Sequence, residues 1–328
     1  MVKESQKNAT LEKRLDYLNL ILSNAEMTAL KNIVTMKIFP VFFILGAPRS
    51  GSTLVTQLLA KSDSFIYPSN FLSRFYQNPI IGSLIQEILT SEELQVENEF
   101  DDIEKSIPLI SNKGKTVGLL SPNEFWYFWK AKIPNIDLYK FNKTSDLLKY
   151  ADIEGIRNSI NGITSIFQKP FFMKGMMFNQ NIDFLEEVFF EPYYIYIKRD
   201  FSNNVESLLQ ARERHFGDKS TWYSFKIKQY SMLRHYKKSD YQVGGQVYYT
   251  NKTISNGLEN VDESRIITIN YESLCSNPHS LYDKISEKLR HHSLKFDTSK
   301  LPKKLNPTRA LTSKYSHIKD YFDEKVKR

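Results

Sequence analysis

The chain has 328 residues and a formal charge of +8, which favours anionic partners such as nucleotides, phosphates or sulfated glycans. Its lysines and arginines are spread along the sequence without a basic block, so nucleic acid is not an expected partner. The single cysteine, Cys275, excludes an intrachain disulfide and a cysteine-based metal site, and the histidines lack zinc-ligand spacing.

The beginning of the chain carries no recognisable targeting signal. Residues 1–10 are polar and do not resemble a secretory signal. The longest apolar run, residues 38–47, is about half the length that a membrane span requires. The sequence therefore predicts no membrane span and a cytoplasmic location, which the lone cysteine also favours.

Leucines and alanines between residues 11 and 29 are spaced alternately by four and three. This periodicity predicts an amphipathic helix over about residues 10–35, with Thr10 as its candidate cap. We expect the helix to pack on the rest of the domain. A coiled-coil contact in a homodimer is the alternative.

Strands alternate with helices along the rest of the chain. Residues 41–45 form a short, continuous apolar run, which is typical of a strand buried on both faces of a parallel sheet. Further strands are predicted at residues 171–174, 193–197 and 265–269, and helices at 54–59, 181–190, 201–214, 222–236 and 278–290. The alternation predicts an α/β fold with a central, mainly parallel sheet flanked by helices.

This pattern indicates a single domain over residues 1–328. We interpret residues 62–168, which contain scattered prolines and an aromatic cluster, as helices and loops inserted after the first strand–helix unit. Residues from about 300 to 328 are rich in lysine and polar, and we predict a tail or lid there.

A glycine-containing loop at residues 46–53 lies between a predicted strand and a predicted helix, the context in which such a loop binds phosphate. Loop amides and the helix dipole favour an anion there. Nucleoside-triphosphate loops need a lysine where Ser52 stands, whereas the basic residue here is Arg49. A kinase or NTPase is therefore the weaker alternative.

Residues 48–53 (Pro-Arg-Ser-Gly-Ser-Thr) resemble the 5′-phosphosulfate loop of P-loop sulfotransferases, and the arginine form is most similar to the tyrosylprotein and bacterial branches. The resemblance implies a P-loop fold that binds 3′-phosphoadenosine 5′-phosphosulfate (PAPS, with product PAP) across its strand ends, without a metal. The loop residues that it implies for the nucleotide are Pro48, Arg49, Ser50, Gly51, Ser52 and Thr53.

Two further motifs carry the same resemblance, which covers roughly residues 40–62 and 170–292. Sulfotransferases bind the 3′-phosphate with an arginine at a strand end and a serine eight residues later, and Arg199 and Ser207 match that spacing. The planar guanidinium suits bidentate contact with phosphate oxygens. Tyr271, in a Tyr-Glu-Ser-Leu segment after the last predicted strand, corresponds to the family's adenine-side tyrosine.

Sulfuryl transfer is an in-line displacement that needs cations for the developing charge and a base for the acceptor proton. Arg49 is the predicted cation. The histidine that serves as base in the cytosolic branch is replaced here by Met176, two residues after Lys174. We expect Lys174 to contact the sulfonate or the acceptor. The glutamate used by the tyrosylprotein branch is also missing from its expected region, residues 67–70.

Glu124 is the best remaining candidate for the base. It precedes the aromatic cluster at residues 125–129, which we expect to wall a cleft and raise the pKa of Glu124 by desolvation. Asp63 and His215 are weaker alternatives.

The resulting hypothesis is a sulfotransferase that moves a sulfuryl group from PAPS to a hydroxyl or amine of a glycan, lipid-linked sugar or small molecule. The non-enzymatic alternative is a degenerate fold that binds PAP or a sulfated glycan without turnover.

Overall fold

The structure is a computed structural model that describes residues 8–33, 38–96, 100, 102–103, 105–109, 111–112, 115–290, 296–305 and 312–327. Its centre is a four-stranded sheet with the strand order β4-β1-β5-β6, and each neighbouring pair in it is parallel. The strands are β1 (Val41–Gly46), β4 (Phe171–Lys174), β5 (Tyr193–Lys198) and β6 (Ile266–Asn270). The predicted α/β class and parallel sheet are confirmed.

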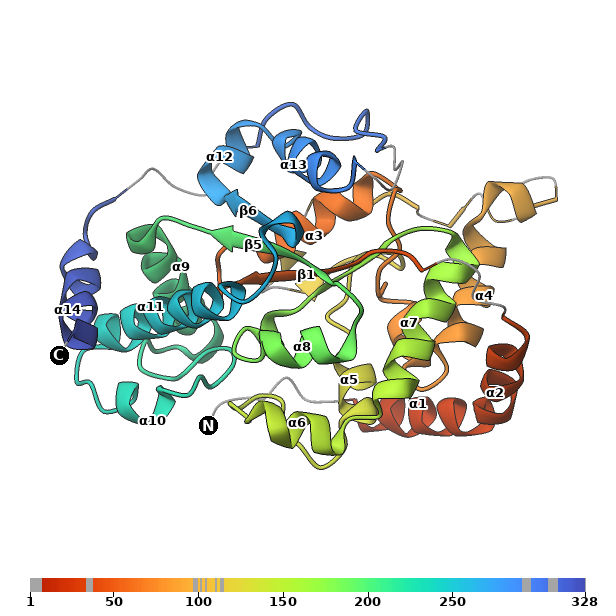
Figure 1. Ribbon diagram of the computed structural model, residues 1–328, viewed down its shortest axis with the longest axis horizontal. Helices are drawn as coiled ribbons and strands as arrows, with labels where there is room; N and C mark the ends of the chain where they lie inside the picture. The colour runs from red at the N-terminus through yellow and green to blue at the C-terminus, as the bar shows by residue number, and fades with distance from the viewer. Residues whose placement is uncertain are drawn as a thin grey trace.

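The side chains of β1 alternate between two hydrophobic clusters, one on each face of the sheet. Phe43 and Leu45 belong to one cluster, and Phe42 and Ile44 to the other, all without solvent exposure. This double burial explains the continuous apolar run in the sequence. Figure 1 shows helices on both faces. One face carries α3 (Ser52–Lys61), α12 (Tyr271–Ser276) and α13 (Ser280–Lys288), and the other carries α5 (Trp126–Lys132), α7 (Ile153–Phe167), α8 (Ile182–Val188) and part of α11 (Ser239–Leu258).

The N-terminal segment forms two helices, α1 (Ala9–Ile21) and α2 (Ser23–Asn32), where the sequence predicted one. The cap is Asn8, whose Oδ1 accepts the Leu11 N–H at 3.1 Å, so the prediction of Thr10 was wrong by two positions. An asparagine ranks at least as high as a threonine in this position.

Both helices pack on the inserted region, and two buried polar side chains make the contact specific. Asn19 Nδ2 donates to the Arg74 carbonyl at 2.8 Å. Glu26 accepts the N–H groups of Ile80 and Ile81 at 3.0 and 2.9 Å, at the start of α4 (Pro79–Thr90). A carboxylate at a helix N-terminus satisfies amides that the helix itself leaves unpaired.

Between residues 62 and 168, the described part of the chain consists of helices and loops with a short hairpin. Besides α4, α5 and α7, its elements are η1 (Leu72–Phe75), η2 (Glu92–Leu94), β2 (Ser111–Asn112), β3 (Lys115–Thr116) and α6 (Thr144–Tyr150). The remaining short elements of the chain are η3 (Met176–Phe178), α10 (Tyr230–Leu233) and η4 (Glu263–Arg265).

The helix predicted over residues 222–236 is wrong, because only α10 is helical in that range. Instead α9 (Phe201–Phe216) is followed by a loop, and the 20-residue α11 comes after it. Gly244 lies in the second turn of α11, where an added Cβ would come within 2.5 Å of Ile318. This close approach favours glycine, and glycine lowers the helical signal of the sequence.

The C-terminal segment contains α14 (Ser316–Lys327), in which Ile318 and Phe322 are buried against α9 and α11. Figure 1 shows this helix beside α9 and α11 at one end of the molecule. The segment is therefore partly a packed helix and not only a polar tail. Residues 306–311 of the predicted tail lie outside the described residues.

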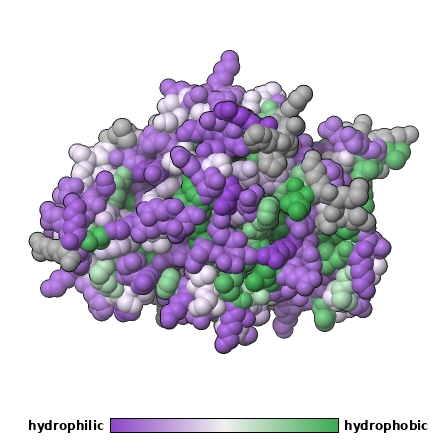
Figure 2. Space-filling view, viewed as in Figure 1, coloured by the Kyte–Doolittle hydropathy of each residue, from purple (hydrophilic) through white to green (hydrophobic). Residues whose placement is uncertain are grey.

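In the face shown in Figure 2, most of the surface is hydrophilic, and apolar side chains gather toward the half that contains α1, α2, α4 and α7. The exposed apolar residues of those helices include Leu20, Ile21, Met27 and Ile88. None of the helices in the described ranges is both long and apolar enough to cross a membrane. The homodimer stays a prediction.

Candidate active site

The loop of residues 46–53 connects β1 to α3 and is held from both sides by asparagines that the sequence analysis did not single out. Asn179 Nδ2 donates to the Gly46 carbonyl at 2.8 Å, and Asn204 Nδ2 donates to the Pro48 carbonyl at 2.7 Å. Arg49 takes a left-handed backbone conformation, with φ of 67°. Such a conformation is costly for a non-glycine residue and is typical of functional loops.

The second motif contacts this loop directly. Arg199, which follows β5, donates from Nη1 to the Arg49 carbonyl at 2.8 Å. Its guanidinium carbon lies 4.4 Å from the centre of the Tyr271 ring. The same ring would lie 2.4 Å from a Cβ atom at Gly51, whose φ is 107°. Three residues chosen from separate motifs, Arg49, Arg199 and Tyr271, therefore meet at one end of the sheet.

Ser207 lies in the second turn of α9 and is largely buried. Two hydroxyl groups at the end of the loop contact neighbouring elements, whereas Ser50 Oγ is buried without a hydrogen-bond partner in the described structure. Ser52 Oγ donates to the Met176 sulfur at 3.1 Å, and Thr53 Oγ1 accepts from Lys174 Nζ at 3.0 Å.

Lys174 and Glu124, the two candidates for acceptor-side chemistry, form an ion pair of 2.7 Å although they are 50 residues apart. Lys174 is the last residue of β4 and is largely buried, while Glu124 precedes α5. The second carboxylate oxygen of Glu124 accepts from Trp126 Nε1 at 3.1 Å. The structure therefore connects the phosphate loop through Thr53 and Lys174 to a carboxylate.

The pKa of Glu124 lies below its ordinary value, opposite to the expectation from the sequence. Burial alone would raise this pKa, but the charge and the hydrogen bond of Lys174 outweigh it, with a smaller contribution from Trp126. We expected the aromatic cluster at residues 125–129 to set this pKa, but Phe125, Phe128 and Trp129 pack in the hydrophobic core, and the lysine that lowers the pKa comes from a distant part of the chain. Glu124 is thus ionised at neutral pH and able to accept a proton.

Aromatic side chains from two loops pack on Trp126, the hydrogen-bond partner of Glu124. Trp126 stacks on Tyr139 with ring centres 4.2 Å apart and on Phe225 with centres 5.4 Å apart. The backbones of the two loops are joined by an isolated parallel β-bridge between Lys140 and Lys226. Of the cluster expected to wall a cleft, Trp126 contacts the carboxylate, while Tyr139 and Phe225 were missed because they contribute through long-range contacts.

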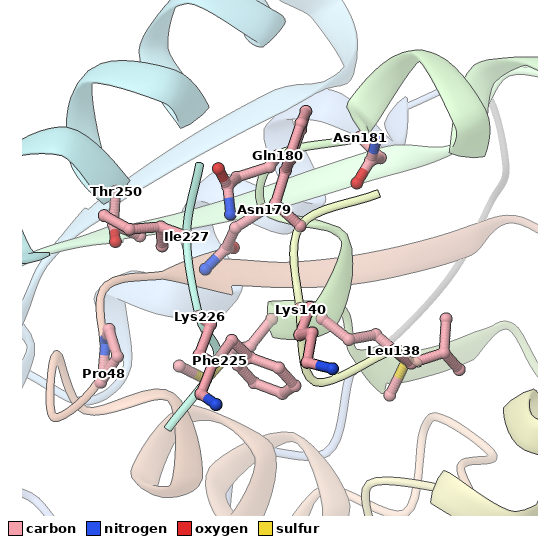
Figure 3. Close-up of a pocket in the computed structure, with 13 residues that line it drawn as sticks. Pro48, Leu138, Lys140, Asn179, Gln180, Asn181, Phe225, Lys226, Ile227 and Thr250 are labelled. Carbon is pink, nitrogen blue, oxygen red and sulfur yellow. The ribbon is translucent and has the colours of Figure 1, made fainter. Parts of the chain in front are cut away.

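Figure 3 shows a narrow pocket beside Pro48, between the same two loops. The side chains of Lys140, Phe225 and Lys226 lie close together in this view, and the amides of Asn179 and Gln180 lie across the pocket from them. This pocket therefore combines aromatic surface with two lysine side chains, of which Lys140 forms an ion pair with Asp137 at 2.8 Å.

The two weaker candidates for the base have different positions. Asp63 forms an ion pair with Lys169 at 2.9 Å, before the start of β4 and so at the opposite end of this strand from Lys174. It is not part of the site. The His215 ring packs on Tyr223 at 4.8 Å, one aromatic layer away from Arg49.

A family model described as the sulfotransferase family matches residues 40–292, which is most of the chain and includes all of these motifs. The chain belongs to the sulfotransferase family. No curated protein matches its sequence.

Solved structures agree on the fold of this sulfotransferase. Sulfotransferase STF9 from Mycobacterium avium superposes with a TM-score of 0.55 and 14% identity, over 93% of this chain and 80% of that one. Sulfotransferase STF1 from Mycobacterium tuberculosis H37Rv superposes with a TM-score of 0.50 and 12% identity, over 92% of this chain and 81% of that one. At such low identity the likeness concerns the fold alone.

Within the described residues, no group of three or more histidines, cysteines, aspartates or glutamates is arranged to hold a metal ion. The polar groups of the site are arginines, lysines, one carboxylate, hydroxyls and side-chain amides.

Proposed function

We propose that this sulfotransferase uses PAPS as its donor and transfers the sulfuryl group to a hydroxyl or amine of a glycan, lipid-linked sugar or small molecule. The observation that carries the proposal is the pair of arginines beside the loop. Arg49 Nε and Arg199 Nε are both buried and lack a hydrogen-bond partner in the described structure. Burying a charged donor without a partner is costly, so these groups favour a bound anion.

The residues around the loop fit the two ends of PAPS. Arg199 and Ser207 would hold the 3′-phosphate, and Tyr271 would lie along the adenine. The loop residues Pro48, Ser50, Gly51, Ser52 and Thr53 would hold the 5′-phosphosulfate at the start of α3, where the helix dipole favours an anion. Burial lowers the pKa of Arg199, and an anion would compensate for that burial.

PAPS supplies the sulfuryl group, and an S–O bond to the acceptor replaces the S–O bond to the phosphate. Arg49 would stabilise the charge on the transferred group and on the leaving phosphate. Glu124 would take the proton from the acceptor, because it is ionised and lies beside the aromatic wall. Lys174, between Thr53 and Glu124, would hold that carboxylate in place and contact the sulfonate or acceptor.

The cytoplasmic location predicted from the sequence remains part of this proposal, as does the absence of a nucleic-acid partner. The free, buried Cys275 is compatible with a reducing compartment.

Calorimetric titration with PAP, and with ATP plus Mg²⁺ in parallel, tests the nucleotide assignment. We expect tight binding of PAP and weak binding of ATP, because only PAP carries a 3′-phosphate. If the protein bound ATP as well as PAP, the result would favour the alternative that it is a kinase or NTPase. Binding of PAP without any turnover of PAPS would instead favour the degenerate binding protein.

A further inference from the structure

The backbone turns sharply at Phe125, the residue that directly follows Glu124. Phe125 takes a left-handed conformation, with φ of 56° and ψ of 34°, just before α5 begins. Such a conformation is unfavourable for a bulky residue other than glycine, and it persists only where the surrounding structure enforces it. The Phe125 ring is fully buried and stacks on Phe128 with ring centres 4.5 Å apart. The turn therefore directs Phe125 into the core and Glu124 toward Lys174.

Asn123 holds this turn with both ends of its side-chain amide. Its Oδ1 accepts the Phe125 N–H at 2.9 Å, and its Nδ2 donates to Asn70 Oδ1 at 2.9 Å. The Asn123 N–H also donates to the Pro68 carbonyl at 2.7 Å. A side-chain oxygen that accepts the N–H two residues later stabilises a tight turn. One asparagine therefore connects the turn to the segment of residues 68–70.

Residues 66–70 connect this turn to β4, the strand that ends at Lys174. Ser69 pairs with Pro122 in an antiparallel β-bridge, and Ile66 pairs in parallel with the first residue of β4. Both members of the ion pair are therefore anchored to the same segment of the chain. A change at either anchor should alter the distance between the carboxylate and the ammonium group.

Resting on the proposed function, we propose that Asn123 and Asn70 are positioning residues for the base. Their amide pair holds the turn at Phe125 and so keeps the Glu124 carboxylate beside Lys174 and directed at the acceptor. Neither asparagine takes part in the chemistry, and both act through the position of Glu124.

The position of Glu124 can be measured because Lys174 carries a charge. Burial alone would raise the pKa of Glu124, whereas the charge and the hydrogen bond of Lys174 lower it. Burial and the charge of Glu124 both raise the pKa values of Tyr139 and Tyr223, so these two phenols are neutral at acidic pH. A Glu124 carboxylate that moves away from Lys174 should therefore titrate at a higher pH.

The first measurement follows the carboxyl group of Glu124 by NMR, in the full chain labelled with carbon-13 at the glutamate carboxyl carbon. Its resonance is assigned by its loss in Glu124→Gln. We expect the titration midpoint to rise in Asn123→Ala, because the carboxylate loses its fixed position beside Lys174. Asn123→Ser should show a smaller rise, since its hydroxyl can still accept the Phe125 N–H.

The second measurement is the hydrolysis of PAPS by the full chain, with water as the acceptor, so that no natural acceptor has to be known. The water oxygen bonds to sulfur while the S–O bond to the phosphate breaks, and its electron pair leaves with PAP. A proton of the water passes to Glu124, and sulfate is released. For Asn123→Ala we expect turnover to fall about 10-fold, because a displaced base loses part of its effect. The acidic limb of turnover should move to higher pH, and PAP affinity, measured by calorimetry, should not change.

The role of Asn70 is tested by non-additivity. Asn70→Ala should lower turnover about as much as the change at its partner, and the double variant should lower it little further, because both changes break the same amide pair. Asn19→Ala is the matched control, since Asn19 Oδ1 likewise accepts a backbone N–H, from Gln77 at 2.9 Å, and the Asn78 amide at 3.2 Å. We expect it to lower the melting temperature and to leave the Glu124 midpoint and the turnover of the folded protein unchanged.

Each outcome decides a different question. An unchanged midpoint or an unchanged turnover in Asn123→Ala would overturn the inference, and so would an equal rise of the midpoint in Asn19→Ala. Additive losses in the double variant would overturn the role of Asn70. A wild-type chain that neither binds PAP nor turns over PAPS would contradict the proposed function itself, whereas the titration of Glu124 would still test the turn.

Discussion

The nucleotide side and the acceptor side of this site are built in different ways. Arg199 and Tyr271 directly follow strands of the central sheet and Arg49 lies in the loop after β1, so the sheet brings the three together. Glu124, Tyr139 and Phe225 come from loops, and their arrangement depends on contacts between those loops. A fixed spacing in the sequence can therefore encode the first side, whereas the second is assembled by packing.

The largest expected effect comes from replacing the proposed base, which should lower turnover without changing nucleotide affinity. Replacing Glu124 with Gln removes the proton acceptor but keeps the shape of the side chain, so turnover of PAPS should fall about 10²- to 10⁴-fold. PAP affinity, measured by calorimetry, should stay within a small factor of the wild type. Glu259→Gln, at the exposed end of α11, is the matched control. A fully active Glu124→Gln protein would move the base elsewhere.

The converse change acts on the nucleotide side. Arg199→Ala removes charge-assisted hydrogen bonds to the 3′-phosphate as well as the bond to the Arg49 carbonyl, and PAP affinity should fall about 100-fold. Arg157→Ala is the matched control, because Arg157 also donates to backbone carbonyls but lies on α7. If both variants bound PAP equally well, Arg199 would not be a phosphate ligand.

A smaller effect tests whether Tyr271 and the loop depend on each other. Gly51→Ala places a methyl group against the Tyr271 ring and should weaken PAP binding about 10-fold, because a tight contact cannot relax without moving the ring. Gly217→Ala has the same kind of left-handed backbone but no atom within 4 Å of the added group. Both should lose stability, and only Gly51→Ala should lose affinity. If the two variants bound PAP equally well, Tyr271 would not contact the nucleotide.

The smallest expected effect is on the pH dependence of PAPS turnover, and it tests the role of Lys174. The charge of Lys174 is what keeps the pKa of Glu124 low against the effect of burial. Without it, in Lys174→Met, burial should raise the pKa of Glu124, and the carboxylate should be protonated at a higher pH. The acidic limb of the rate of PAPS turnover should then move to higher pH. An unmoved limb would mean that Glu124 does not control that limb.

Much of the sheet was predictable because its strands are short apolar runs that are buried on both faces. The residues proposed for the nucleotide come from motifs that lie within one strand–helix unit each, and the structure brings Arg49, Arg199 and Tyr271 together. The corrections have one cause in common, which is contact between distant segments. Lys174 lowers the pKa of Glu124 although it lies 50 residues away in the sequence. Gly244, which packs close to Ile318 of α14, weakened the helical pattern of α11 in the sequence.

The bridge between Lys140 and Lys226 has a consequence for the evolution of the family. This β-bridge joins the loop of Lys140 to the loop of Lys226. A change in the length of either loop therefore displaces the aromatic residues of the other. Neither loop contributes a strand to the sheet that positions the arginines. Among related enzymes, residues across this bridge should therefore covary with one another as acceptors change, while the strand ends stay constant.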